Sequence, residues 1–174
     1  DYIARALRGG YPEAVRRNDL GRRARFFEAY VSDLIRRDVH QISEIDRPAD
    51  MRRLLNVVAA QMATLAVPHA LSSALSIPGS TLTRYLNLLE QVFVIRRIPA
   101  WSNNLTTRAV ATPKMIVIDS GVAGHLAAMT LKRAQRPTAV VGPLLENFVL
   151  SELARQLSWA PEPIQLYHYR DRDG

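Results

Sequence analysis

Cysteine is absent from this 174-residue chain, and long apolar runs are absent as well. Without cysteine, the chain has no disulfide, no thiolate metal ligand and no thiolate nucleophile. No apolar run approaches the roughly 20 residues that a helix needs to span a bilayer. The chain opens with charged and polar residues, so no signal peptide is recognisable. These absences predict a cytoplasmic protein without a membrane partner.

Motifs for catalysis are also missing. No G-x-x-x-x-G-K-[ST] segment occurs, so nothing in this chain cradles ATP phosphates as a P-loop does. Ser120 lacks the G-x-S-x-G elbow of a hydrolase. The histidines are scattered, without the spacing of zinc ligands; they are His40, His69, His125 and His168. We expect no bound metal or cofactor and no complete catalytic site in this chain.

Positive charge is concentrated in the middle of the sequence. The net charge is +7, and the segment from Met51 to Ile118 contains a single acid, Glu90. Its cations are Arg52, Arg53, Arg84, Arg96, Arg97, Arg108 and Lys114. A cluster of this kind is typical of proteins that bind a phosphate backbone, provided that the arginines share one exposed surface. The alternative is that they aid solubility or meet an acidic protein surface.

The same central segment predicts three helices followed by strands. An almost wholly apolar helix runs from Met51 to about Leu65, with Asp50 as its cap. A short second helix spans Pro68–Leu75, and a third begins near Ser80 after a Pro-Gly turn. Strands are expected at residues 92–95 and 110–118, separated by a polar turn at 102–107. This order indicates a winged helix-turn-helix.

The third helix presents two different faces. Leu82, Tyr85, Leu86 and Leu89 recur at helical spacing and should face the core. Thr83, Arg84 and Asn87 lie on the opposite face, where they could contact bases or phosphates. Arg96 and Arg97 stand at the start of the hairpin, and Arg108 follows in it. These six polar residues are the expected nucleic-acid contacts: Thr83, Arg84, Asn87, Arg96, Arg97 and Arg108.

Two acids near the C-terminal part have competing interpretations. Asp119 follows an apolar strand, a common place for a catalytic acid, but Asp-Ser-Gly is also an ordinary helix-capping turn, which we favour. Glu146 follows Pro143 at the start of an amphipathic helix. It could ligate a metal in an intact protein, although a first-turn acid that stabilises the helix dipole is the simpler role for this chain.

Several short motifs occur in an order that resembles a known family. They are GGYPEA at 9–14, LIRRDV at 34–39, LTRYLNLLEQVFVIRRIPAWSNN at 82–104, PKMIVIDSGVAGHL at 113–126, PLLENFVLSEL at 143–153 and LYHYRDRDG at 166–174. Together they resemble the domain of unknown function that follows the P-loop module in bacterial and archaeal predicted AAA-type ATPases. The resemblance covers essentially the whole chain.

The resemblance implies an N-terminal domain that binds ATP and Mg²⁺ and that this chain does not contain. It also implies that the C-terminal part opens a PD-(D/E)XK nuclease-like fold, in which Glu146 matches the acid of the first helix. The Asp and the Glu-x-Lys pair of such a site are missing here, so metal-dependent cleavage cannot be assembled.

We therefore expect an α+β fold in three parts. Residues 1–48 form a helical section, residues 49–118 a central winged helix-turn-helix, and residues 119–174 the start of a truncated α/β nuclease-like segment. The expected function is that of a non-catalytic region of an AAA-type ATPase that binds DNA through the winged helix. The alternatives are a protein–protein module that docks on the ATPase domain or self-associates, and part of a nuclease in the intact protein.

Overall fold

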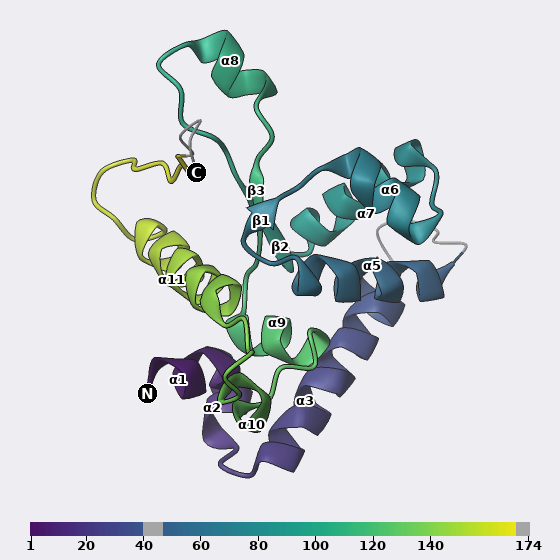
Figure 1. Cartoon of the computed structure of the whole chain (residues 1–174), viewed down its shortest axis with the longest axis vertical. Coiled ribbons are helices and arrows are strands. Elements are labelled where there is room, and N and C mark those ends of the chain that lie inside the picture. Colours follow the sequence, from purple (N-terminus) through teal and green to yellow (C-terminus); the bar gives the residue numbers. More distant parts are fainter. Residues whose placement is uncertain (40–46, 170–174) are drawn as a thin grey trace.

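The chain combines many helices with one small antiparallel sheet, which confirms the α+β class (Figure 1). The computed structural model describes residues 1–39 and 47–169. His40 and the last five residues of the LYHYRDRDG motif therefore lie outside the described residues. Within the described ranges, no helix is both long and apolar enough to cross a bilayer.

The N-terminal section is helical, as its sequence predicts. Asp1 and Asp19 cap two of its helices through their carboxylates, and Pro12 stands at the first position of another. The last helix of the section widens into a π-helix at its C-terminal end. These elements are α1 (Tyr2–Arg8), α2 (Pro12–Arg16), α3 (Leu20–Asp33) and η1 (Leu34–Val39).

The central segment has the element order of a winged helix-turn-helix. One helix and a short strand precede a helix pair, which is followed by two longer strands. They are α5 (Pro48–Ala60), β1 (Thr64–Leu65), α6 (Pro68–Leu75), α7 (Gly79–Gln91), β2 (Ile95–Ile98) and β3 (Lys114–Val117). The strands pair in the order β1-β3-β2, and both pairings are antiparallel. The predicted helix Pro68–Leu75 is confirmed.

Other expectations for this segment are wrong in detail. Asp50 lies inside the first turn of α5, which Pro48 opens, and Ser80 lies inside α7. The strand expected at residues 92–95 begins only at Ile95, because α7 continues to Gln91 and Phe93 takes a positive φ of 56° in the turn that follows. Consequently Arg96 and Arg97 lie within β2.

A long connection links β2 to β3 and contains a helix that we did not expect. Asn104 caps α8 (Leu105–Val110) by accepting from the Thr107 backbone N–H at 3.0 Å. In Figure 1, α8 projects beyond the sheet. The C-terminal stretch returns to this connection, where His168 bridges Ala100 in parallel orientation. The connection is therefore braced by residues far away in the sequence.

The remaining helices follow β3. They are α9 (Ser120–Leu126), α10 (Leu131–Ala134) and α11 (Gly142–Leu157). One hydrophobic cluster contains buried side chains from the N-terminal helices, the winged helix, α9 and α11. Its most deeply buried members include Val31, Leu54, Leu82, Val117 and Leu144. All three predicted segments share this core, and the boundaries drawn between them at residues 48 and 118 stay a prediction.

Asn147 of α11 completes the hydrogen bonding of β3. Beyond the short β1, no strand among the described residues pairs with the backbone of Val117 on that side. The Val117 N–H donates to Asn147 Oδ1 at 2.8 Å, and Asn147 Nδ2 donates to the Val117 carbonyl at 2.9 Å. Asn147 is fully buried. Its amide side chain thus replaces a neighbouring strand.

We predict that Asn147→Ala destabilises the chain by about 2 kcal/mol, because it leaves a buried backbone N–H without an acceptor. Urea unfolding followed by circular dichroism measures this change. Asn18→Ala, at an exposed position before α3, should change the free energy of unfolding by less than about 0.5 kcal/mol. Equal effects of the two substitutions would contradict the role given to Asn147.

Candidate nucleic-acid interface

The helix pair α6–α7 holds the candidate interface in place. Ser76 ends α6 in the left-handed conformation, and the Ser72 hydroxyl donates to the Ile77 carbonyl at 2.6 Å. These features turn the chain sharply into α7. The inward face of α7 is buried as predicted, with no side chain of the expected set more than 2% exposed. That set is Leu82, Tyr85, Leu86 and Leu89.

The outward face of α7 is open to solvent. Thr83, Arg84 and Asn87 are all exposed. The Arg84 guanidinium lies 5.6 Å from the centre of the Tyr85 ring, which orients it along the helix surface. No ion pair of Arg84 occurs in the described part of the chain. Its charge is therefore free to meet an external anion.

Arg97 connects β2 to this face. Its backbone N–H donates to Glu90 Oε1 at 3.1 Å, and its guanidinium forms an ion pair with the same carboxylate. Both terminal nitrogens of Arg97 also donate to Asn87 Oδ1 at 3.1 Å. Arg96, the preceding residue in the strand, is exposed. Arg97 and Asn87 are thus tied to each other, whereas Arg96 is open.

Arg108 lies elsewhere, on α8. Its guanidinium stacks over Trp101 at 4.3 Å and lies 5.1 Å from the centre of the Tyr167 ring. It also donates to the Ser102 carbonyl at 2.9 and 2.6 Å. The structure therefore places Arg108 in an aromatic stack that joins the β2–β3 connection to the C-terminal stretch.

The clustered positive charge of the sequence is largely compensated in space. Arg52 pairs with Glu28 at 2.7 Å, and Arg53 lies 3.4 Å from Asp50. Lys114 forms an ion pair with Glu146. These three central cations therefore have acidic partners, and a shared exposed surface for the central arginines stays a prediction. Acids outside the segment neutralise part of its charge, and within residues 47–118 Arg84 and Arg96 form no ion pair with the described residues.

Glu146 does not occupy the first turn of its helix. It is the fifth residue of α11, and its carboxylate pairs with Lys114 of β3. The role of a first-turn acid is therefore wrong for this residue. Within residues 1–39 and 47–169, no group of three or more His, Asp or Glu side chains is arranged to hold a metal ion.

Asp119 is a helix cap, as predicted, but it also has a second partner. Its carboxylate accepts from the Val122 N–H at 2.9 Å and from the Gly10 N–H at 2.7 Å, and only 4% of the residue is exposed. Gly9, with φ of 73°, lies so close that an added Cβ would be 2.4 Å from Asp119 Oδ1. In the sequence, only the adjacent glycines Gly9 and Gly10 indicate that this turn can approach Asp119 so closely.

Next to the contact between Gly10 and Asp119, Tyr11 bonds to a second tyrosine. The hydroxyl oxygens of Tyr11 and Tyr30 are 2.8 Å apart and share a hydrogen bond. Burial raises the pKa of Tyr11, and the hydrogen bond with Tyr30 raises it further. Tyr11 therefore stays protonated over the whole physiological range, so the hydrogen bond between the two hydroxyl groups persists there.

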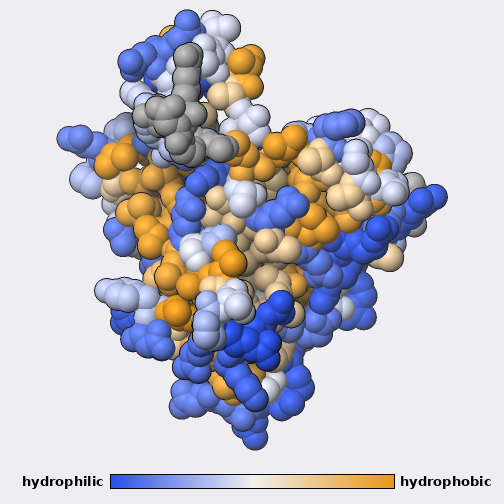
Figure 2. Space-filling model, in the orientation of Figure 1, coloured by the Kyte–Doolittle hydropathy of each residue, from blue (hydrophilic) through white to orange (hydrophobic). Residues whose placement is uncertain are grey.

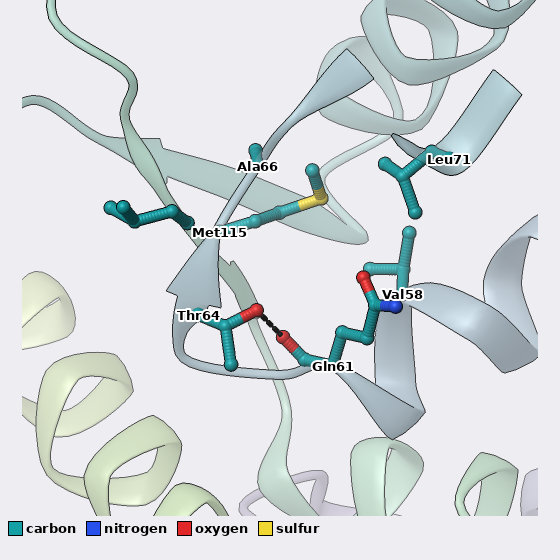
Figure 3. Close-up of a pocket in the computed structure, with 7 residues that line it drawn as sticks. Val58, Gln61, Thr64, Ala66, Leu71 and Met115 are labelled. Carbon is teal, nitrogen blue, oxygen red and sulfur yellow. Dashed lines mark hydrogen bonds between the residues drawn. The ribbon is translucent and has the colours of Figure 1, made fainter. Parts of the chain in front are cut away.

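A small hollow beside the sheet is shown in Figure 3. Side chains from the end of α5, β1 and β3 surround about 10 Å³, and the Thr64 hydroxyl donates to the Gln61 carbonyl at 2.7 Å. This volume holds at most one water molecule. The hollow is a packing feature of the winged helix and cannot admit a substrate.

Fold and site together define an α+β protein with a winged helix whose α7 face is polar and open. The chain belongs to the family described as Domain of unknown function (DUF8612), whose model matches residues 1–133. It is 29% identical over 164 residues to uncharacterized proteins of Mycobacterium bovis and Mycobacterium tuberculosis. The aligned part is 94% of this chain and 36% of each relative, so the chain spans about a third of their length. No solved structure matches significantly.

We predict that Gly9→Ala destabilises the chain by about 3 kcal/mol. The new Cβ would collide with the Asp119 carboxylate, and the backbone conformation, with ψ near −174°, strongly disfavours any side chain. Thermal and urea unfolding measure the loss. Gly142→Ala is the matched control, because a Cβ there meets nothing within 4 Å. A Gly9→Ala protein as stable as this control would show that the turn does not dock on Asp119.

We predict that part of the stability depends on ionised Glu28. Hydrogen bonds from Arg52 and then from His125 lower the pKa of Glu28 below its ordinary value of 4.5. A lowered folded-state pKa contributes stability above the ordinary value, and that contribution disappears as the pH falls through the lowered one. Urea unfolding at about pH 6 and about pH 3 should therefore show a destabilisation by Glu28→Gln that shrinks on acidification. Glu162→Gln, at an exposed position, should show no such trend.

Proposed function

We propose that this chain is a non-catalytic region of an AAA-type ATPase and that it binds duplex DNA through α7 and β2. The exposed face of α7, with Thr83, Arg84 and Asn87, is the observation that carries the proposal. In helix-turn-helix proteins the second helix of the pair enters the major groove. Here α7 is that second helix, and its inward face is fully used in the core.

Arg84 and Arg96, which form no ion pair with the described residues, would contact different parts of the DNA. Arg84 on α7 faces the groove together with Thr83, and Arg96 on β2 contacts the phosphate backbone. Arg97 acts as a positioning residue, since its bonds to Glu90 and Asn87 fix the strand against the helix. With few free cations, the interface should bind DNA modestly and with a shallow dependence on salt.

Association with an ATPase domain is supported by the order of the sequence motifs and by the length of the relatives. Only 36% of each mycobacterial relative aligns with this chain, which leaves room for an additional domain. That domain would bind ATP and Mg²⁺. A nuclease site that includes Glu146 in the intact protein is an alternative, and it would require Glu146 to leave Lys114 and join acids outside this chain.

A protein-interaction module is the second candidate, because α11 leaves apolar side chains uncovered. Val149 is 52% exposed and Leu153 40%, and Trp159 just beyond the helix is 71% exposed. Figure 2 shows hydrophobic residues gathered over this helix. A surface of this kind suits docking on the ATPase domain or self-association.

We predict that labelled duplex DNA binds the whole chain at low salt and that Arg84→Ala and Arg96→Ala each weaken binding. Each lost phosphate contact should reduce the slope of log K against log salt by about 1. Fluorescence anisotropy over a salt series measures both effects. Arg25→Ala on α3, also exposed, is the matched control and should leave affinity and slope nearly unchanged.

Two outcomes would contradict DNA binding by this face. One is the absence of any duplex binding at low salt, and the other is an equal loss in Arg25→Ala and Arg84→Ala. Co-purification with the ATP-binding domain, without affinity for DNA, would instead favour the interaction module.

A further inference from the structure

A sizeable groove lies in the helical part of the molecule, away from the α7 face. It has a volume of about 420 Å³ and lies between α1, α3, α9 and the segment that leads into α10. Its lining residues include Leu7, Leu20, Arg23, Phe27, His125 and Met129. Clefts of this volume, mostly apolar with a few polar groups, are typical of small-molecule sites.

The walls of the groove are mostly apolar, and the helices that form them approach each other closely. Gly121 of α9 lies against α3, since an added Cβ would be 2.6 Å from the Phe27 ring. Gly124 similarly allows the Leu7 side chain of α1 to approach. Leu20, at the start of α3, is 68% exposed although it lines the groove. An apolar molecule in the groove would remove Leu20 and its neighbours from water.

One wall of the groove carries a cation without a counter-charge. Arg23 is held in place by donating from Nε to the Ala14 carbonyl at 3.1 Å and from Nη2 to the Arg17 carbonyl at 2.5 Å. These bonds leave the two N–H groups of Nη1 without an acceptor in the described part of the chain. Burial lowers the pKa of Arg23, and the positive charge of Arg8 lowers it further.

Arg8 adds a second unsatisfied guanidinium nearby. Its Nε is buried and has no hydrogen-bond partner among the described residues. Neither Arg8 nor Arg23 forms an ion pair there, whereas the neighbouring Arg17 pairs with Glu13. Glu28, which reaches His125 in the groove wall, already pairs with Arg52. Buried donors of charged groups are normally hydrogen-bonded to an acceptor. A bound anion would also offset the repulsion between the two neighbouring cations.

We propose that this groove binds a small amphipathic anion, with its apolar body between Leu7, Phe27 and Met129 and its carboxylate or phosphate group at Arg23. The apolar body replaces water along the walls, and the anionic group accepts from the free Nη1 donors. The charge of Arg8 strengthens the attraction. His125 on the opposite wall keeps its bond to Glu28.

Calorimetric titration of the whole chain with octanoate, octan-1-ol and inorganic phosphate tests this proposal. Octanoate should bind at least about tenfold more tightly than octan-1-ol, because only octanoate carries a negative charge that can form an ion pair with the Arg23 guanidinium. Inorganic phosphate, which has no apolar body, should bind more weakly than octanoate. Tighter binding of octyl phosphate than of octanoate would identify the preferred anionic group as a phosphate.

Variants separate the groove from the rest of the surface. Arg23→Gln and Arg8→Gln should each weaken octanoate binding about tenfold, whereas the exposed Arg22→Gln on the same helix should not. Ala24→Leu fills the groove from α3 and should abolish binding. Because Arg23 also holds α2, Arg8→Gln and Ala24→Leu decide the question if Arg23→Gln unfolds.

Three results would overturn the proposal. Octanoate and octan-1-ol could bind with equal affinity, which would remove the role of the cations. Ala24→Leu could retain full octanoate binding, which would place the ligand elsewhere. No heat or chemical-shift change with octanoate at millimolar concentration would show that the groove does not bind such molecules.

Discussion

The buried carboxylate of Asp119 joins the N-terminal helices to the rest of the molecule. It accepts a backbone N–H from Gly10, which lies 109 positions earlier in the chain, and another from Val122 in its own helix. Burying a carboxylate is costly unless donors replace the lost water, and these two N–H groups do so. Moving either backbone segment would remove one of the two donors from this buried carboxylate. The Asp119 side chain therefore joins the turn between α1 and α2 to the start of α9.

Helix α9, which Asp119 caps, packs against four other helices. It contacts α1, α3, α5 and α11, although it spans only seven residues. Small residues make this convergence possible: Gly121 lies against Phe27 and Gly9, and Gly124 lies against Leu7. Larger side chains at these positions would separate the helices. Both the groove and the packing of α5 against α9 consequently depend on the small side chains of α9.

Local sequence signals predicted the helices well and the long-range contacts poorly. Prolines and apolar spacing located α6 and the inward face of α7, because both depend on neighbouring residues alone. The sequence did not predict that β2 begins only at Ile95, since this start depends on the positive φ of Phe93. Helix α8 replaces the second half of the polar turn expected at 102–107 and the start of the strand expected at 110–118, because this short segment has no apolar periodicity that would indicate a helix. The outward face of α7 could be predicted, but the bond between Arg97 and Asn87 could not, because it requires the strand to return beside the helix.

Net charge along the sequence was the most misleading signal, and Glu28 shows why. This residue lies outside the basic segment, yet its carboxylate accepts from Arg52 at 2.7 Å and lies 3.1 Å from His125 Nε2. Folding thus brings an acid from α3 to a cation of α5. The same carboxylate touches the first helix of the winged helix and the wall of the groove. One carboxylate therefore connects the first helix of the winged helix to the wall of the groove, a contact between segments far apart in the sequence.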